Sequence, residues 1–439
     1  MTLPTLPLLS ADDHQSPLFW RLGKPISRAC FASAVATLAE RLPDGRYLIN
    51  RCHTRYGFCT TLIAAALRGQ TCLLPGHDHS SAILDPAYAD ARTASDDPSA
   101  AADLLVPLQP LTVGGRIPSV ISAQYPLAIV FTSGSTGQPQ PHIKTWGSLW
   151  HASRRIDKYL LDGIDSASIV ATVPMHHMYG LETTVALPLA SHHAAVDTRP
   201  VFPEDVRRTL VTVSTPRVLI TAPVHIRALL EARVKLPQLA RIISATAPLP
   251  LDLARRAEAV FSAPVFEIYG CTEAGSIASR RSVNGSLWTP LRGLRVSQVD
   301  GRSVVSGDYL DKPVPLHDQL QLQDSNDGSF MLIGRSDDVV KVGGKRASLA
   351  DLTYKLLSIP GVIDGVVFQP DDADKTVILR RLAALVVAPR LSENEILTAF
   401  SHLIDPVFLP RPLRRVEDLP RNATGKLPHD ALKELLAHA

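Results

Sequence analysis

The chain contains, at residues 127–140, the stretch Leu127-Ala-Ile-Val-Phe-Thr-Ser-Gly-Ser-Thr-Gly-Gln-Pro-Gln140. Its first five residues are apolar and predict a short buried strand. Every position from Thr132 to Gly137 is a hydroxyl residue or a glycine. This pattern suits a phosphate site, because glycines let backbone N–H groups approach a ligand and the hydroxyls add donors. The Gly-Lys-Ser/Thr ending of a Walker A loop is absent, and a flexible Ser/Gly turn is the alternative interpretation.

Segments that predict strands alternate with helical segments on both sides of this loop. Apolar runs at Ile169–Val173, Val218–Ala222 and Val265–Ile268 predict further buried strands. Phe31–Leu42 has the apolar spacing of a helix, whereas Asp85–Ala102 is rich in Ala, Asp, Ser and Pro and predicts a solvated connector. Because strands alternate with helices, we expect an α/β sheet.

A second, smaller unit is predicted after the charged, glycine-flanked segment Gly334–Gly344. The residues that follow contain candidate helices at Leu349–Leu357 and Glu393–Ile404 and candidate strands at Val362–Gln369 and Leu382–Val387. These elements suffice for a small lid.

Composition and charge exclude several classes of protein. The 45 basic and 42 acidic residues give a net charge of +3, too small to indicate a nucleic-acid or membrane partner. The five cysteines form no C-x-x-C pair, so we expect neither a disulfide framework nor a zinc site, and a reducing cytoplasm is the natural location. The sequence has neither an apolar run of about 18 residues nor a basic leader, so no transmembrane helix or signal peptide is expected.

The loop at residues 132–137 resembles the phosphate loop of the adenylate-forming superfamily, which comprises acyl- and aryl-CoA synthetases, adenylation domains and luciferases. Further segments similar to the family's motifs follow in the family's order. They are Pro174–Gly180 (P-x-H-H-x-x-G), Ala245–Leu249 (G-A-P-L), Tyr269–Glu273 (Y-G-x-T-E), Gly334–Arg346 (G-R-x-D-D-x-x-K-x-x-G-x-R) and Leu419–Lys426 (P-R-x-x-x-G-K). The chain is therefore identified as a member of this superfamily, although residues 1–126 carry no motif that we can assign.

The resemblance implies a fold with two parts. A large N-terminal α/β domain with stacked sheets would span residues 1–335. A small, mobile C-terminal α+β lid domain would span residues 336–439. The family's motifs leave little room for subdomain strands between Gly285 and Leu316, which we expect to be compressed.

The resemblance also implies a reaction that joins a carboxylate to the α-phosphorus of ATP and releases pyrophosphate. Both reactants are anionic, so the site must align them and neutralise their repulsion. Glu273 would hold Mg²⁺, a hard cation that prefers carboxylate and phosphate oxygens, and Thr272 would bind a phosphate oxygen. The other residues expected to bind ATP are Thr132, Ser133, Gly134, Ser135, Thr136 and Gly137 at the phosphates, Ala245, Thr246, Ala247, Tyr269 and Gly270 on the adenine side, Asp318 at the ribose, and Arg335 at the ribose or a phosphate.

Lys426 is the main catalytic candidate. In the family it bridges the attacking carboxylate and the ribose or α-phosphate oxygens, and a lysine supplies a compact charge with three donors. The lid of the family rotates between the two half-reactions, so Asp337 is expected at the hinge. Gly343 and Gly344 would then leave room for the pantetheine arm of an incoming thiol.

The acid pocket is expected near His177, with His176 the less favoured choice and Tyr179 and Gly270 alongside. Amino-acid-activating relatives hold an aspartate in this region, and its absence here argues for an acid without an α-amino group. A satisfied pair of core histidines is the alternative. The pairs His77–His79 and His192–His193 are expected on the surface, without a metal.

Two departures from the family's pattern affect the functional prediction. The phosphate loop ends in Pro139-Gln140 where a Pro-Lys is usual, so a charge contact is lost or Lys144 replaces it. No phosphopantetheine attachment site follows Lys426, so the acceptor thiol is expected from CoA or from a separate acyl carrier protein.

We therefore predict an aryl acid ligase that activates a hydroxybenzoate-like acid, similar to the compact stand-alone ligases of aryl polyene and xanthomonadin pigment pathways. An aliphatic acyl-CoA synthetase and a degenerate, non-catalytic nucleotide-binding member are the alternatives. A group of arginines is expected to face an acidic carrier protein unless they are ordinary solvated residues: Arg380, Arg381, Arg411, Arg414 and Arg415.

Overall fold

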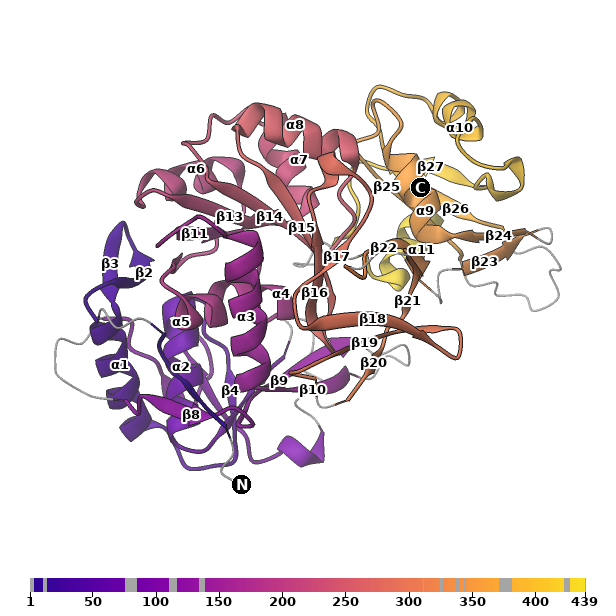
Figure 1. Cartoon of the computed structure of the whole chain (residues 1–439). Helices are drawn as coiled ribbons and strands as arrows, with labels where there is room; N and C mark the ends of the chain where they lie inside the picture. The colour runs from indigo at the N-terminus through magenta and orange to yellow at the C-terminus, as the bar shows by residue number, and fades with distance from the viewer. Residues whose placement is uncertain are drawn as a thin grey trace.

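The computed structural model describes residues 4–10, 14–75, 85–109, 117–133, 139–310, 312–323, 327–335, 339–342, 345–370, 381–421 and 427–438. Two large sheets dominate it, and the C-terminal segment lies beside one end of them (Figure 1). Among the described residues, no helix is both long enough and apolar enough to cross a membrane.

The larger sheet has nine strands in the order β17-β16-β15-β14-β13-β11-β12-β2-β3. The strands from β15 to β2 are parallel, and β16, β17 and β3 add antiparallel edges. The predicted apolar runs become three of its central strands, as expected for strands covered on both faces. The bounds are β2 Pro17–Arg21, β3 Lys24–Ser27, β11 Ser168–Ala171, β12 Ala194–Val196, β13 Arg217–Thr221, β14 Arg241–Ser244, β15 Val265–Cys271, β16 Gly275–Arg280 and β17 Thr289–Pro290.

The second sheet has the order β10-β9-β5-β4-β6-β7 and contains the strand predicted at residues 127–131. Its strands are parallel except for the antiparallel pair β9–β10, whose hairpin carries the predicted phosphate loop. The bounds are β4 Tyr47–Asn50, β5 Thr71–Leu74, β6 Arg92–Ser95, β7 Leu104–Leu105, β9 Pro126–Ser133 and β10 Pro139–Thr145, and β1 Thr5–Pro7 pairs with β8 Val120–Ser122 outside it.

One hydrophobic core joins the two sheets, since its buried side chains come from β9, β11 and the helices between them. A second core lies on the opposite face of the nine-stranded sheet, under α6, α7 and α8 (Figure 1). The sheets are therefore stacked, as predicted. The helices of this part are α1 Arg28–Arg41, α2 Arg55–Leu67, α3 Trp146–Leu160, α4 Met178–Gly180, α5 Leu187–Ala190, α6 Pro203–Val211, α7 Pro223–Glu231 and α8 Leu251–Phe261, with the π-helical segment η3 at Leu181–Ala186.

The prediction of a solvated connector at residues 85–102 is wrong in part. Strand β6 lies inside it and pairs with β4, because small residues such as Ala94 fit against the sheet. The carboxylate of Asp96, just after β6, accepts hydrogen bonds from the backbone N–H groups of His53 and Thr54, at 2.6 and 2.9 Å. The connector therefore holds the start of α2.

The region after residue 285 forms complete antiparallel strands rather than the compressed ones expected. β18, β19 and β20 make a three-stranded sheet, and β21 pairs with β22. Their buried side chains pack with Tyr269 and Trp288 in a core of their own, which gives these short strands an apolar face. The bounds are β18 Leu294–Val299, β19 Arg302–Gly307, β20 Val314–Pro315, β21 Asp318–Leu322 and β22 Phe330–Arg335.

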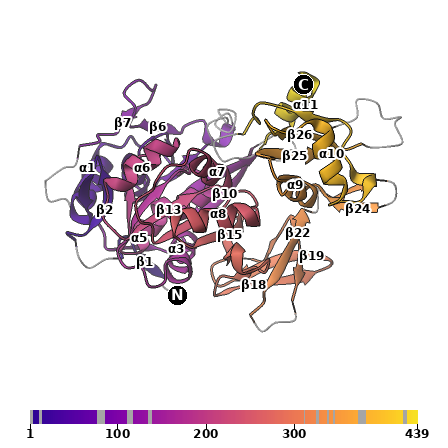
Figure 2. The same cartoon turned by 90° about the horizontal axis from the view of Figure 1, so that it is seen from above.

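The C-terminal segment has two hydrophobic cores that contain only residues from Val340 onward. Figure 2 shows it set beside the larger part. The separate cores support a boundary at residues 335/336, which stays a prediction because residues 336–338 lie outside the described residues. The bounds are β23 Val339–Val342, β24 Lys345–Ser348, α9 Leu349–Leu357, β25 Asp364–Phe368, β26 Ala383–Val387, α10 Glu393–Ser401, β27 Leu413–Arg415 and α11 His429–His438.

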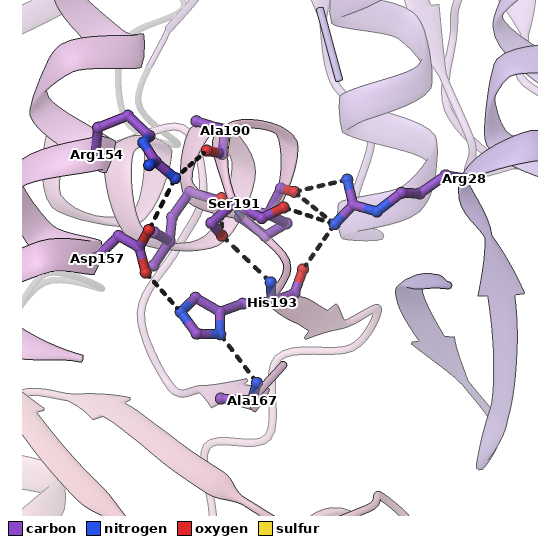
Figure 3. Close-up of polar contacts among 9 residues, drawn as sticks. Arg28, Arg154, Asp157, Ala167, Ala190, Ser191 and His193 are labelled. Carbon is purple, nitrogen blue, oxygen red and sulfur yellow. Dashed lines mark hydrogen bonds and ion pairs between the residues drawn. The ribbon is translucent and has the colours of Figure 1, made fainter. Parts of the chain in front are cut away.

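The expected surface position of the His192–His193 pair is wrong for His193, which is 2% exposed. Its Nε2 lies 2.9 Å from Asp157 Oδ1, and its Nδ1 accepts from the backbone N–H of Ala167 (Figure 3). The neighbouring Arg28 is also buried and donates to the carbonyls of Pro188, Ser191 and His193. This region is therefore structural, and the pair at His77 and His79 lies outside the described residues.

Candidate active site

A cleft of about 1540 Å³ lies between the large part of the chain and the C-terminal segment. It opens at the carboxyl ends of β14 and β15, the usual ligand position in an open α/β sheet. The cleft collects most of the predicted nucleotide-binding residues whose side chains are described: Thr246, Ala247, Tyr269, Gly270 and Asp318. Ala245 is buried next to them and does not line the cleft.

Thr246 has a backbone φ of +79°, which a β-branched residue rarely adopts. It stands where the family's G-A-P-L pattern has glycine, the residue that adopts this conformation without strain. Non-glycine residues in this region cluster at functional sites, because the surrounding structure must hold them there. The strained position at the edge of the cleft agrees with the expected role of this loop.

Tyr269 and Asp318 are joined by a hydrogen bond of 2.7 Å from the phenol to Asp318 Oδ2. The tyrosine ring packs against Trp288 and Phe330, each with a centroid distance of 5.8 Å. In the β21–β22 pair, Asp318 lies directly opposite Arg335, so two residues predicted at the ribose meet across one ladder. The side chain of Arg335 lies outside the described part.

The turn between β15 and β16 carries Thr272 and Glu273 to the same end of the sheet. Gly270 precedes it, and a Cβ there would lie 2.3 Å from the carbonyl oxygen of Gly275. This close approach explains why the Y-G-x-T-E motif has glycine at its second position. The turn is thus folded tightly back on itself and presents its polar residues outward.

Glu273 lies beside the phosphate hairpin. His142, on β10, has its Nε2 3.7 Å from Glu273 Oε1 and 3.0 Å from Thr132 Oγ1. Burial opposes ionisation of Glu273, but its own backbone N–H, His142 and Lys144 outweigh burial and hold the pKa below its usual value. An ionised, part-exposed carboxylate next to the phosphate loop fits Mg²⁺. Sequence reasoning missed His142, whose only signal is its place on the strand after the loop.

Lys144 does not lie in the open cleft, where it could replace the missing loop lysine. Its side chain is 4% exposed, and Nζ donates to the backbone carbonyl of Glu273 at 2.9 Å. Gln140 is exposed and lies opposite Thr132 in the β9–β10 ladder. Lys144 therefore binds the backbone of the turn that carries Glu273.

A second, small cavity lies beside the predicted acid-binding segment and is lined by His177, Tyr179, Gly180 and His225, among others. Tyr179 donates its hydroxyl to the carbonyl of Ile243 at 2.9 Å. His225, on α7, has its Nδ1 2.7 Å from Thr172 Oγ1. Burial, with the nearby positive charge of Arg199, lowers the pKa of His225 to about 4. Sequence reasoning missed His225, which no family motif contains.

Several predicted residues lie outside the part of the chain that the structure describes. They are Gly134, Ser135, Thr136 and Gly137 in the phosphate loop, Asp337 at the hinge, Gly343 and Gly344, and Lys426. The backbone of Ser133 is described at the end of β9, but its side chain is not. The roles of all these residues stay predictions. Within the described residues, no group of three or more His, Cys, Asp and Glu side chains is arranged to hold a metal.

Comparison with protein families matches residues 46–309 to the AMP-binding enzymes. The chain belongs to this family. The match confirms the predicted superfamily. It does not distinguish the aryl polyene subtype from other members.

Two curated relatives are 4-coumarate–CoA ligases. The one from Rhodobacter capsulatus is 33% identical over 237 residues, which are 54% of this chain and 58% of that protein. The one from Halorhodospira halophila is 29% identical over 324 residues, or 70% of this chain and 76% of that protein. The match therefore spans less than two thirds of the first relative's length.

A solved structure with a similar fold is o-succinylbenzoate–CoA synthetase from Bacillus subtilis in complex with its acyl-adenylate intermediate. The TM-score is 0.79 at 18% identity, covering 98% of this chain and 99% of that one. The likeness confirms the predicted α/β fold with stacked sheets over nearly the whole length of this chain.

Proposed function

We propose that the chain is an ATP-dependent ligase that activates a carboxylic acid as acyl-AMP and passes the acyl group to a phosphopantetheine thiol. The observation that carries this proposal is the meeting of three separate segments at one end of the sheet. His142 of the phosphate hairpin contacts both Thr132 and Glu273, and the Tyr269–Asp318 pair lines the cleft.

In the first half-reaction, a carboxylate oxygen attacks the α-phosphorus, and the bond to the β-phosphate oxygen breaks with release of pyrophosphate. Thr132 and the loop after it would hold the leaving phosphates, and Asp318 would accept hydrogen bonds from the ribose hydroxyls. Glu273 would hold Mg²⁺, which supplies positive charge to the leaving pyrophosphate. Lys426 would neutralise charge between the carboxylate and the α-phosphate.

In the second half-reaction, the thiol sulfur attacks the acyl carbon, the bond to the AMP oxygen breaks, and the thiol proton passes to solvent. We propose that the C-terminal segment turns about Asp337 between the two steps. The turn would withdraw Lys426 and bring Gly343 and Gly344 to the path of the thiol. The cleft between the two parts of the chain supports such a motion, because the residues lining it come from both.

We propose a hydroxybenzoate-like aryl acid as the substrate, in a pigment pathway of the cytoplasm. The residues around the small cavity support this choice, because they combine rings and small apolar residues with the imidazoles of His177 and His225. The cavity itself has a volume of about 10 Å³, room for about one water molecule, so an aryl acid would have to widen it on binding. No Asp or Glu is among its described lining residues, so an α-ammonium group would find no counter-charge there. The five cysteines are all free, which agrees with a reducing compartment.

The test is pyrophosphate exchange over a panel of acids, with 4-hydroxybenzoate, 3-hydroxybenzoate, 4-coumarate, hexanoate, malonate and tyrosine. We expect exchange to be fastest with a hydroxybenzoate and absent with tyrosine. Exchange with none of the acids would refute the ligase, and exchange confined to the aliphatic acids would refute the aryl substrate while leaving the ligase standing.

We propose a separate acyl carrier protein as the natural acceptor. The backbone N–H of Arg411 donates to the carbonyl of Leu382, which places Arg411 next to the exposed Arg381. Arg415 is also exposed, whereas Arg414 is paired with Glu393 at 3.4 Å. The support is therefore a set of exposed arginines around the β26–β27 pair, with Arg381 and Arg411 before the two strands and Arg415 at the end of β27, which suits an acidic partner.

Reversal of charge in Arg411→Glu with Arg415→Glu should slow acyl transfer to a carrier protein about tenfold and leave transfer to CoA unchanged. Arg295, exposed on β18 in the large part of the chain, provides the matched control, and Arg295→Glu should alter neither rate. Equal rates of carrier loading for the double variant and the control would show that these arginines are ordinary solvated residues with no part in carrier binding.

A further inference from the structure

A cluster of buried polar side chains lies behind the β15–β16 turn, and the chemistry proposed above does not use it. Lys144 on β10, Arg155 on α3, Glu182 on η3 and Ser276 on β16 are 4%, 8%, 1% and 3% exposed, respectively. Charged residues are almost never this deeply buried unless they are paired. β10 and α3 follow one another, but η3 and β16 lie further along the sequence, so the cluster exists only in the folded chain.

Glu182 binds the backbone at the end of the turn. Its carboxylate accepts the N–H of Ser276 at 3.1 and 3.3 Å and also accepts the Ser276 hydroxyl. The preceding Gly275 has a φ of +75°, and a Cβ there would lie 2.2 Å from Glu182 Oε1. The carboxylate therefore occupies the space that any other side chain at residue 275 would need.

Lys144 binds the same turn from the other side. Its ammonium donates to the carbonyl oxygen of Glu273 at 2.9 Å. Burial raises the pKa of the Glu182 carboxyl, and the hydrogen bonds from Ser276 and the charges of Lys144 and Arg155 act in the opposite direction. The groups that also face these residues are Cys271 and Glu273 at Lys144, and Asp308 and Tyr309 at Arg155. Buried Lys144 and Glu182 are thus compensated by each other and by backbone groups of the turn.

The elements that meet in this cluster are those that carry the proposed active site. β10 belongs to the phosphate hairpin with Thr132 and His142. η3 follows the acid-pocket segment with His177 and Tyr179, and a π-helical segment of this kind frequently marks a functional region. The turn itself carries Glu273.

We propose that Lys144 and Glu182 are positioning residues that hold the Glu273 turn against the phosphate hairpin and the acid-pocket segment. The proposal rests on the function proposed above, in which Glu273 binds Mg²⁺ with ATP. Neither residue touches the substrates in this role. They fix the carboxylate in place, as the outer partners of metal ligands do in other sites.

The test compares Glu182→Gln, Lys144→Met and the double variant with the intact chain. The main measurement is the Mg²⁺ concentration needed for half-maximal ATP binding. ATP binding is measured by calorimetry in the absence of the carboxylic acid substrate. Each single variant leaves the other charge buried and unpaired, so we expect a requirement for Mg²⁺ about 10- to 100-fold higher. The double variant leaves neither charge, so it should lie closer to the intact chain than either single variant.

Two further variants separate positioning from general stability. Glu258→Gln breaks another carboxylate–arginine pair, whose Glu258 Oε2 lies 2.7 Å from Arg281 Nη2, and should lower the melting temperature without changing the Mg²⁺ requirement. Ser276→Ala removes only the hydroxyl donor to Glu182 and should raise the requirement two- to threefold. If the single variants fail to fold, Ser276→Ala decides between the outcomes.

A Mg²⁺ requirement unchanged in the single variants and in Ser276→Ala would overturn the positioning role and leave the cluster purely structural. A double variant no better than the worse single variant would refute the coupling of Lys144 to Glu182. If the intact chain bound no ATP at any Mg²⁺ concentration, the proposed function itself would fail, and this result is distinct from both others.

Discussion

Two buried polar regions of this molecule contain the same kinds of charged and polar side chain but connect different parts of the fold. Around His193, the buried Arg28 donates to carbonyls at the end of α5 and Asp157 binds the imidazole (Figure 3). Behind Glu273, Lys144 and Glu182 bind the backbone of a turn that faces the cleft. The first region connects helices and strands that do not line the cleft. The second connects the elements that carry the proposed active site. A buried charged side chain therefore does not by itself indicate a functional role. The elements that the side chain connects are what indicate such a role.

The largest effect is expected from Lys426→Ala, at the proposed catalytic lysine. Loss of the charge that stabilises the transition state should slow adenylation about 10²- to 10³-fold, without a change in melting temperature. Thioester formation from preformed acyl-AMP should be spared. Time-course assays of each half-reaction measure the two rates, with Lys433→Ala on α11 as the control. Equal losses in both half-reactions would contradict the assigned role.

The opposite pattern is expected around His193. Arg28→Leu leaves the carbonyls of Pro188 and Ser191 without their donor, which should lower the free energy of unfolding by about 3 kcal/mol. The KM values for ATP and acid should stay unchanged in the folded protein. Urea unfolding and pyrophosphate exchange measure the two quantities. A changed KM with unchanged stability would remove the contrast between the two regions.

The dependence of stability on pH sharpens the comparison between cavity and scaffold. Burial lowers the pKa of both His225, at the small cavity, and His151, which stacks on Tyr309, to about 4. Between pH 4 and 6.5 the unfolded chain binds more protons at these groups, so stability should fall as the pH falls through this window. A pKa lowered from 6.5 to about 4 corresponds to about 3 kcal/mol at most for each histidine, and to less for the part-exposed His151 because solvent screens its charge.

Replacement by glutamine should flatten this dependence in both cases. Only His225→Gln should also raise the KM for the acid, by about tenfold, because His151 is absent from the lining of the cavity. Chemical denaturation at several pH values and exchange kinetics provide the two readouts. If His151→Gln changed the KM as much as His225→Gln does, the cavity would not be the acid pocket.

The smallest effect is expected from relief of backbone strain in Thr246→Gly. Glycine adopts φ near +79° freely but costs more conformational entropy, so the net gain should be about 0.5–1 kcal/mol. Ser262→Gly, at the left-handed residue that ends α8, should give a similar gain far from the cleft. Only Thr246→Gly should change the KM for ATP. A lower melting temperature for both variants would refute the strain argument.

Much of the fold follows from local pattern. The apolar runs predicted the central strands, and α9 has the predicted bounds, because these segments carry their own period and end signals. The segment around β6 was missed, since its short, polar strand is stabilised by pairing with β4 and not by its own composition. The two parts of the chain were expected from motif order, and their separate cores agree with that order.

The ordered motifs determined the superfamily and the expected positions of the phosphate loop, Glu273 and the ribose pair, because each motif is a local run of residues. The support of Glu273 was decided by tertiary structure alone. Lys144, Glu182 and Ser276 meet across more than 130 residues of chain, and each reads as an ordinary polar residue until packing removes water from it. Once they are buried, these polar groups must be satisfied by one another and by the backbone. The sequence pattern does not show which side chains will be buried together.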